Sequence, residues 1–269
     1  MSRHPIGVFD SGLGGLTIVR EIRRRLPSES IVYFGDIARL PYGIKSKEQI
    51  RLFSLQNTHF LLRHKVRAVV IACNSSSSAA YHYLKAHFRV PVVDVIEPAA
   101  AEAVERTQTG RIGVIGTSAT IESGAYEKAI LRKDPALKIF TASCPLFVPL
   151  VEEGWTDKEI VLRAAQVYLH RLKKQKVDVL ILGCTHYPLL KSAIQRVIGK
   201  RVQLIDSIGP TVQKLASFLK RSEVSYPARR GRRRGELKVF VSDKPRNFIK
   251  LGERFLGERL NHVKVVRNL

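Results

Sequence analysis

Two cysteines follow apolar segments at matching places in two parts of the chain. Cys73 comes directly after residues 69–72, and Cys184 comes directly after residues 179–183. A thiol can exchange a proton near neutral pH, because the pKa of an unperturbed cysteine is about 8.5. Two such thiols at opposite sides of one cleft could act on both faces of a single carbon atom. The spacing therefore indicates proton transfer to and from one carbon.

The segments around the two cysteines belong to a longer internal repeat. Residues 6–11 resemble residues 112–117, and residues 93–98 resemble residues 205–210, at nearly the spacing that separates the cysteines. The repeat predicts two related α/β units. Each unit places one thiol at the carboxyl end of a strand, where ligands bind in open α/β sheets.

Polar residues surround both thiols. In the segment Cys73-Asn74-Ser75, the thiol stands at a strand-to-helix turn, where the positive end of the helix is expected to lower the cysteine pKa. The amide and hydroxyl groups could bind a carboxylate, although Ser76, Ser77 and Ser78 could also serve only to begin the helix. In the segment Cys184-Thr185-His186, the imidazole could tune the proton affinity of the neighbouring thiol.

Three further segments have weaker signals. The turn Asp10-Ser11-Gly12-Leu13-Gly14-Gly15 could hold an anion, but it lacks the spacing of a dinucleotide site or a P-loop and could be purely structural. Tyr42 and Gly43 lie in a turn that could form one wall of a cleft. Cys144 has little polar company and is interpreted as structural, and the role of Glu152 and Glu153 is left open between capping a helix and lining the cleft.

Short β-branched segments alternate with longer amphipathic ones, which is typical of parallel sheets covered by helices on both faces. The expected strands are residues 6–9, 31–34, 68–72, 92–95, 112–115, 177–182, 202–205 and 237–241. The expected helices are residues 16–26, 47–65, 77–88, 98–107, 118–131, 157–175, 188–197 and 209–219, followed by one more helix after the last strand.

These elements predict an α/β fold of two pseudo-symmetric domains, with mostly parallel sheets flanked by helices and the active site in the interdomain cleft. Residues 1–98 and 209–269 are expected to form the first domain, which carries Asp10 and Cys73. Residues 99–208 are expected to form the second, which carries Cys184 and His186.

Composition and net charge bear on the cellular location and the possible partners of the protein. The 269 residues have neither an apolar leader nor a stretch long enough to cross a membrane, and three cysteines do not make a disulfide framework, so a cytoplasmic location is expected. The net charge is +23, and part of it lies in Arg229-Arg230-Gly231-Arg232-Arg233-Arg234. This run is interpreted mainly as a solvated loop, and contact with nucleic acid or an acidic surface is the less favoured alternative.

Several segments together resemble one family, the glutamate racemases of the cofactor-independent aspartate/glutamate racemase group. The resemblance is carried by residues 7–16, 41–43, 72–74, 144–154 and 183–190, in the order and at the spacing of that family.

The resemblance implies interconversion of L- and D-glutamate without pyridoxal phosphate or a metal, supply of D-glutamate for peptidoglycan, and a homodimer. It implies that Cys73 and Cys184 are the two catalytic acid/bases, with Asp10 and His186 as assisting groups. It also places Asp10, Ser11, Tyr42, Gly43, Asn74, Ser75, Thr185 and His186 on substrate-binding positions.

The chain departs from the family pattern at Ser75, where threonine is usual, and in its arginine-rich run. Three alternatives stay open on the sequence alone. An aspartate racemase shares the layout, although His186 favours the glutamate enzyme. Nucleic-acid binding through residues 229–234 is a second alternative. A zinc site built from Cys73, Cys184 and His186 is the third, and it lacks close cysteine pairing and a clear fourth ligand.

Overall fold

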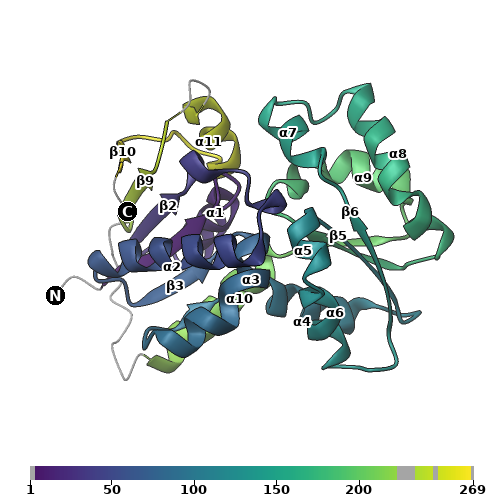
Figure 1. Cartoon of the computed structure of the whole chain (residues 1–269), viewed down its shortest axis with the longest axis horizontal. Coiled ribbons are helices and arrows are strands. Elements are labelled where there is room, and N and C mark those ends of the chain that lie inside the picture. Colours follow the sequence, from purple (N-terminus) through teal and green to yellow (C-terminus); the bar gives the residue numbers. More distant parts are fainter. Residues whose placement is uncertain (1–3, 223–233, 245–247, 268–269) are drawn as a thin grey trace.

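Two sheets with helices on their faces make up the fold (Figure 1). The computed structural model describes residues 4–222, 234–244 and 248–267. The first sheet contains β1 (Ile6–Asp10), β2 (Ile31–Gly35), β3 (Ala68–Ile71), β4 (Val92–Val93), β9 (Leu237–Val241) and β10 (Val263–Val265). The second contains β5 (Arg111–Gly116), β6 (Lys138–Ser143), β7 (Val179–Gly183) and β8 (Gln203–Asp206). All pairings between these strands are parallel, as predicted.

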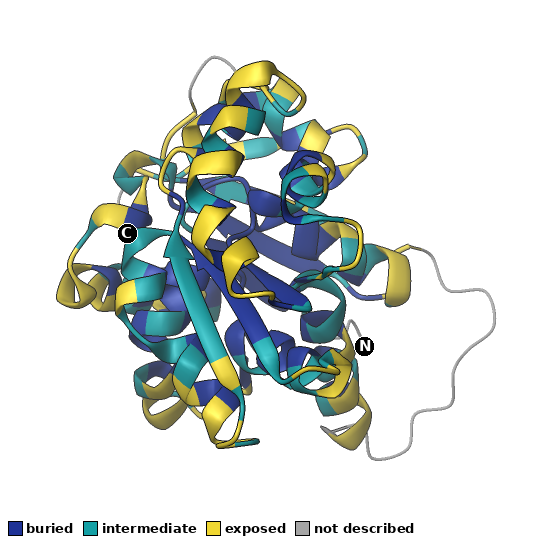
Figure 2. Ribbon diagram, turned by 90° about the vertical axis from the view of Figure 1, so that its right-hand side faces the viewer, coloured by how far each residue is buried: buried dark blue, intermediate teal, exposed yellow. Residues whose placement is uncertain are grey.

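The helices lie outside the sheets, and the central strands are buried (Figure 2). Strands β1 and β7 are buried along their whole length, because helices cover both faces of each sheet and leave little room for polar side chains. The helices are α1 (Leu16–Arg25), α2 (Lys47–Arg63), α3 (Asn74–His87), α4 (Ile96–Arg106), α5 (Ser118–Glu122), α6 (Ala125–Leu131), α7 (Phe147–Glu152), α8 (Glu159–Lys174), α9 (Lys191–Ile198), α10 (Ile208–Ser222) and α11 (Phe248–Leu256).

The internal repeat reappears as a common strand order. The first sheet contains the order β2-β1-β3-β4, and the second has the order β6-β5-β7-β8, so β1 corresponds to β5 and β3 to β7. Asp10 ends β1 and Cys73 follows β3, while Thr117 follows β5 and Cys184 follows β7. Because neighbouring parallel strands end at the same edge of a sheet, each lobe brings its polar turns together at one place.

The carboxyl-terminal part of the chain extends the first sheet. Strand β9 pairs with β2, and β10 pairs with β9. Helix α11 packs against α1 on the same lobe. The sequence predicted β9 and a helix after it but not β10, which has only three residues and is half-exposed or exposed throughout, so it lacks an apolar signal.

Other elements differ in detail from the prediction. The helix expected at residues 118–131 is divided into α5 and α6, because Gly124 between them has a left-handed backbone with φ of 62°. Strand β6 was missed, since it is an edge strand that is nowhere fully buried and includes Thr141 and Ser143. Helix α7 was also missed. Helix α3 begins at Asn74, earlier than expected, and this makes Cys73 its N-cap residue.

Candidate active site

A pocket of about 350 Å³ lies where the polar turns of the two lobes meet. It is lined by all of the predicted site residues except Asp10, namely Ser11, Tyr42, Gly43, Cys73, Asn74, Ser75, Cys184, Thr185 and His186. The other residues that line it are Leu40, Pro41, Ile44, Thr117, Ser118, Pro145, Val148, Pro149 and Glu152. Cys73 comes from the first lobe and Cys184 from the second, so the two thiols share one cavity.

Cys73 lies at the amino end of α3 and is only 6% exposed. Its thiol donates a hydrogen bond to Ser11 Oγ across 3.5 Å. Burial, assisted by the negative charge of Asp10, raises the pKa of Cys73 to about 11. The expectation of a lowered pKa for Cys73 was therefore wrong. The Ser76 amide at the start of the helix does favour the thiolate, but desolvation outweighs this contact.

Cys184 has a different neighbourhood, in which His186 lies between the thiol and a carboxylate. His186 Nδ1 is 3.9 Å from Cys184 Sγ, and its Nε2 is 3.1 Å from Glu152 Oε1. Burial acts to lower the pKa of His186, but the hydrogen bonds with Cys184 and Glu152 outweigh burial and raise this pKa to about 10. Both hydrogen bonds favour the cationic form of the imidazole, which lies beside Cys184. Of the two acids left open by the sequence, Glu152 lines the pocket, whereas Glu153 is exposed.

The raised pKa of His186 predicts a loss of stability in mildly alkaline solution. Because the folded state holds this proton more tightly, its contribution is complete below about pH 6.5 and is lost as the pH rises toward 10. Between pH 6.5 and 9, we expect the free energy of unfolding to fall by up to about 1.4 kcal/mol per pH unit, the slope of one proton. Urea unfolding at several pH values measures this slope. The slope should flatten in His186→Asn, and an equal slope in that variant would contradict the assignment.

Asn74 offers the pocket an unused donor. Its Oδ1 accepts a hydrogen bond of 2.7 Å from the Tyr126 hydroxyl, which fixes the orientation of the amide. Among the described residues, its buried Nδ2 has no hydrogen bond partner. A buried amide of this kind loses free energy unless an acceptor reaches it. Asn74 therefore brings to the pocket lining a donor that has no protein partner within the described part of the chain.

Hydroxyl groups from both lobes meet beside Asn74. Ser75 Oγ lies 2.9 Å from Thr117 Oγ1 and 3.4 Å from Thr120 Oγ1, so a residue after β3 contacts two residues after β5. Thr117 was not among the predicted binding residues. The repeat could have identified it, because Thr117 follows β5 as Ser11 follows β1.

Tyr42 and Gly43 form another part of the pocket wall, and Gly43 lies against Thr117. The Tyr42 hydroxyl donates a hydrogen bond to Asp36 and accepts one of 3.1 Å from Asn57, so that hydroxyl is already engaged away from a ligand. A Cβ atom on Gly43 would lie 2.7 Å from Thr117 Cβ. This close approach explains why a glycine stands where the turn of the first lobe meets the second lobe.

Asp10 lies beneath the pocket rather than in its lining. It is fully buried, and its Oδ2 accepts a hydrogen bond of 3.0 Å from the Gly12 amide. Burial raises the pKa of Asp10, while the charge of His186 opposes this effect. Gly14 brings the same turn against the second lobe, since a Cβ there would lie 2.1 Å from Thr185 Oγ1. Asp10 therefore contributes a buried carboxyl group near Cys73 and His186.

The apolar wall of Pro145, Val148 and Pro149 was also missed as a lining. These residues lie within the segment that carries the family resemblance, but nothing in their side chains signals binding. Cys144 in the same segment is fully buried, and its thiol donates to the Ala142 carbonyl across 3.7 Å, which fits the structural role predicted for it.

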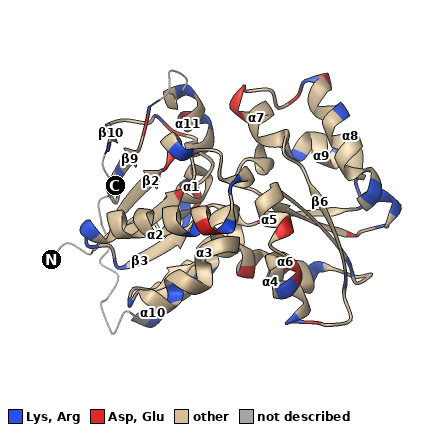
Figure 3. Ribbon diagram, in the orientation of Figure 1, with Lys and Arg blue, Asp and Glu red and all other residues tan. Residues whose placement is uncertain are grey.

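The remaining sequence alternatives gain no support from the described residues. Within residues 4–222, 234–244 and 248–267, no group of three or more His, Cys, Asp or Glu side chains could hold a metal ion. In the same ranges, no helix is long and apolar enough to cross a membrane. Residues 229–233 of the arginine-rich run lie outside the described residues, and Lys and Arg elsewhere are spread over both lobes (Figure 3).

Two lobes of common strand order, with a pocket between them that holds one thiol from each, define a two-domain α/β enzyme that acts on a small molecule. The chain belongs to the Asp/Glu/Hydantoin racemase family, whose model matches residues 14–215. It is therefore an isomerase.

Individual relatives agree with this assignment. A glutamate racemase from Geobacter metallireducens is 48% identical over 258 residues, which cover 96% of this chain and 94% of the relative. The crystal structure of glutamate racemase from Francisella tularensis in complex with D-glutamate has a TM-score of 0.91 at 39% identity, and the match covers 98% of this chain and 97% of that one. An aspartate racemase homologue from Pyrococcus horikoshii shares the fold at 17% identity, with a TM-score of 0.57 and coverage of 81% of this chain and all of that one.

Proposed function

We propose that this racemase interconverts L- and D-glutamate by a two-thiol, cofactor-independent reaction. The observation that carries the proposal is the shared pocket, which Cys73 enters from the first lobe and Cys184 from the second. The full-length similarity to proteins named glutamate racemase supports glutamate as the substrate. The distant similarity to an aspartate racemase homologue does not favour aspartate.

Racemisation requires that one group removes the α-proton and another delivers a proton to the opposite face. In the proposed reaction, one cysteine begins as the thiolate and the other as the thiol, and the roles reverse with the handedness of the substrate. His186, held by Glu152, stabilises the negative charge on Cys184. Burial disfavours the thiolate of Cys73, and the cationic ammonium group of the bound substrate is expected to stabilise it.

The α-proton of a free amino acid is weakly acidic, and the carbanion needs hydrogen bonds to its carboxylate. The Nδ2 group of Asn74 and the hydroxyls of Ser75 and Thr117 are the donors that we assign to the α-carboxylate. Ser11, Gly43 and Thr185 are assigned to the rest of the substrate, together with Tyr42 through groups other than its hydroxyl, which is hydrogen-bonded to Asp36 and Asn57. Asp10 completes the site as an assisting group beneath Cys73 and His186.

The proposal extends to the cellular setting and to the organisation of the chain. It includes supply of D-glutamate for peptidoglycan, a cytoplasmic location and a homodimer, each of which rests on resemblance to glutamate racemases. It also includes the division into a domain of residues 1–98 and 209–269 and a domain of residues 99–208. The strand order in the two sheets supports this division.

Incubation of the protein with L-glutamate in D₂O tests the reaction. We expect the optical rotation to decay to zero while deuterium appears at Cα, because the proton delivered to the product comes from a thiol that exchanges with solvent. Prior treatment with a chelator should leave the rate unchanged. Faster turnover of aspartate than of glutamate would overturn the substrate assignment, and inversion without deuterium would overturn the proton-transfer mechanism.

A further inference from the structure

The carboxyl-terminal helix α11 contacts the turn that follows α7, across the boundary between the lobes. Arg254 Nη1 donates to the Gly154 carbonyl at 3.1 Å, and Arg254 Nη2 donates to Thr156 Oγ1 at 2.6 Å. Helix α11 packs on α1 of the first lobe, and α7 packs on α8 of the second. Figure 1 shows α11 and α7 at the same side of the molecule, facing each other. The turn held by Arg254 begins two residues after Glu152, the partner of His186.

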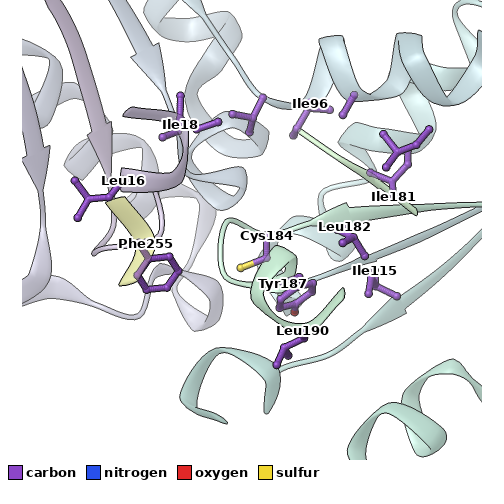
Figure 4. Packing of buried hydrophobic residues seen from close by; sticks show 14 of the residues in the cluster. Leu16, Ile18, Ile96, Ile115, Ile181, Leu182, Cys184, Tyr187, Leu190 and Phe255 are labelled. Atoms are coloured by element: carbon purple, nitrogen blue, oxygen red, sulfur yellow. The ribbon is translucent and has the colours of Figure 1, made fainter. Parts of the chain in front are cut away.

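The next residue of α11 reaches the imidazole itself. The rings of Phe255 and His186 are 5.2 Å apart between centroids and are inclined by 75°, an edge-to-face contact. Phe255 is 1% exposed and His186 is 3% exposed, so this contact is inside the protein. Phe255 belongs to the same buried cluster as Cys184 (Figure 4). Among the described residues, Phe255 is the aromatic residue whose ring contacts the imidazole of His186.

His186 is thus held from three sides. Its Nδ1 faces Cys184, its Nε2 faces Glu152, and its ring lies against Phe255. The distance of 3.9 Å to sulfur is long for a hydrogen bond, so a small rotation of the ring would break it. The Phe255 ring packs edge-to-face on the imidazole and opposes such a rotation.

We propose that α11 is a positioning element for the Cys184 side of the active site, in which Phe255 orients His186 and Arg254 holds the segment that carries Glu152. Helix α11 lies outside residues 14–215, the part of the chain that the family model matches, so this role does not follow from the family pattern. The inference rests on the proposed function, because it assigns work to His186 in the racemase site. In this proposal, a helix of the first lobe affects the reactivity of Cys184 in the second lobe.

Two variants test the proposal, each with a control on the same helix. Phe255→Leu removes the ring contact, and Phe248→Leu makes the same change at a residue that is equally buried. Arg254→Gln removes both hydrogen bonds, and Lys250→Gln changes an exposed cation of the same helix. The principal measurement is the rate of alkylation of Cys184 and Cys73 by iodoacetamide at pH 7, resolved by peptide mass spectrometry.

In Phe255→Leu we expect alkylation of Cys184 to slow by about tenfold relative to that of Cys73, because the thiolate loses its oriented imidazolium. Turnover of glutamate should fall about 10- to 100-fold with little change in KM, as is usual for groups that orient a catalytic side chain. Arg254→Gln should change both quantities in the same direction by a smaller factor. Phe248→Leu and Lys250→Gln should resemble the unchanged protein.

Equal effects of Phe255→Leu and Phe248→Leu would overturn the proposal, because they would show a general loss of packing. Unchanged reactivity of Cys184 in both test variants would also overturn it. If Phe255→Leu does not fold, Arg254→Gln decides the question, since Arg254 is exposed. A protein that fails to racemise glutamate while its Cys184 reactivity still depends on Phe255 would refute the proposed function and leave the positioning role intact.

Discussion

Replacement of either Cys73 or Cys184 by serine should lower the turnover of glutamate by about 1,000-fold, within the range expected for removal of a general acid or base. An alcohol is a much weaker acid than a thiol, so it can neither begin as the anion nor supply a proton readily. Each cysteine is 6% exposed and the substitution changes little volume, so the fold should persist. Initial rates of racemisation from both enantiomers, together with the free energy of unfolding, measure the effect.

The third cysteine supplies a matched control. Cys144 is fully buried, and a hydroxyl in its place can still donate to the Ala142 carbonyl. Cys144→Ser should therefore keep its activity within a few-fold. Normal turnover by Cys73→Ser or by Cys184→Ser would refute a two-thiol reaction, and a loss in Cys144→Ser as large as theirs would show that the assay reports on folding.

A change of Asn74 to aspartate should raise KM for glutamate by about 100-fold or more. The two side chains have nearly the same shape, and an aspartate oxygen can still accept the hydrogen bond from Tyr126. The free Nδ2 donor, however, becomes an acceptor that repels a substrate carboxylate. Steady-state kinetics with each enantiomer would separate this effect on KM from a smaller effect on kcat.

A control variant separates the added negative charge from the loss of the Asn74 donor. Gln166→Glu replaces an exposed amide on α8 and adds the same charge at a residue outside the pocket lining, so its KM should stay close to that of the unchanged protein. Unfolding of Asn74→Asp should remain cooperative. If KM were unchanged in Asn74→Asp, the α-carboxylate would have to lie elsewhere in the pocket.

Because of the internal repeat, the fold and most of the site could be predicted from the sequence. Apolar segments before Cys73 and Cys184 indicated strands, and parallel strands place the residues that follow them at one edge. Strand β6 and the division between α5 and α6 were not predicted. An edge strand carries polar residues on its exposed side, and a single glycine at Gly124 ends one helix and begins another without changing the apolar pattern.

The sequence by itself determined the alternation of strands and helices and the polar residues beside each thiol, because both are encoded within a few neighbouring positions. It also paired the two thiols, because the two halves of the repeat can be compared without knowledge of the fold. Only the tertiary structure decided the pKa direction of Cys73, the contact of Glu152 and Phe255 with His186, and the position of Asp10 beneath the pocket. These properties depend on desolvation and on contacts between residues far apart in the chain, and neither is set by local composition or periodicity.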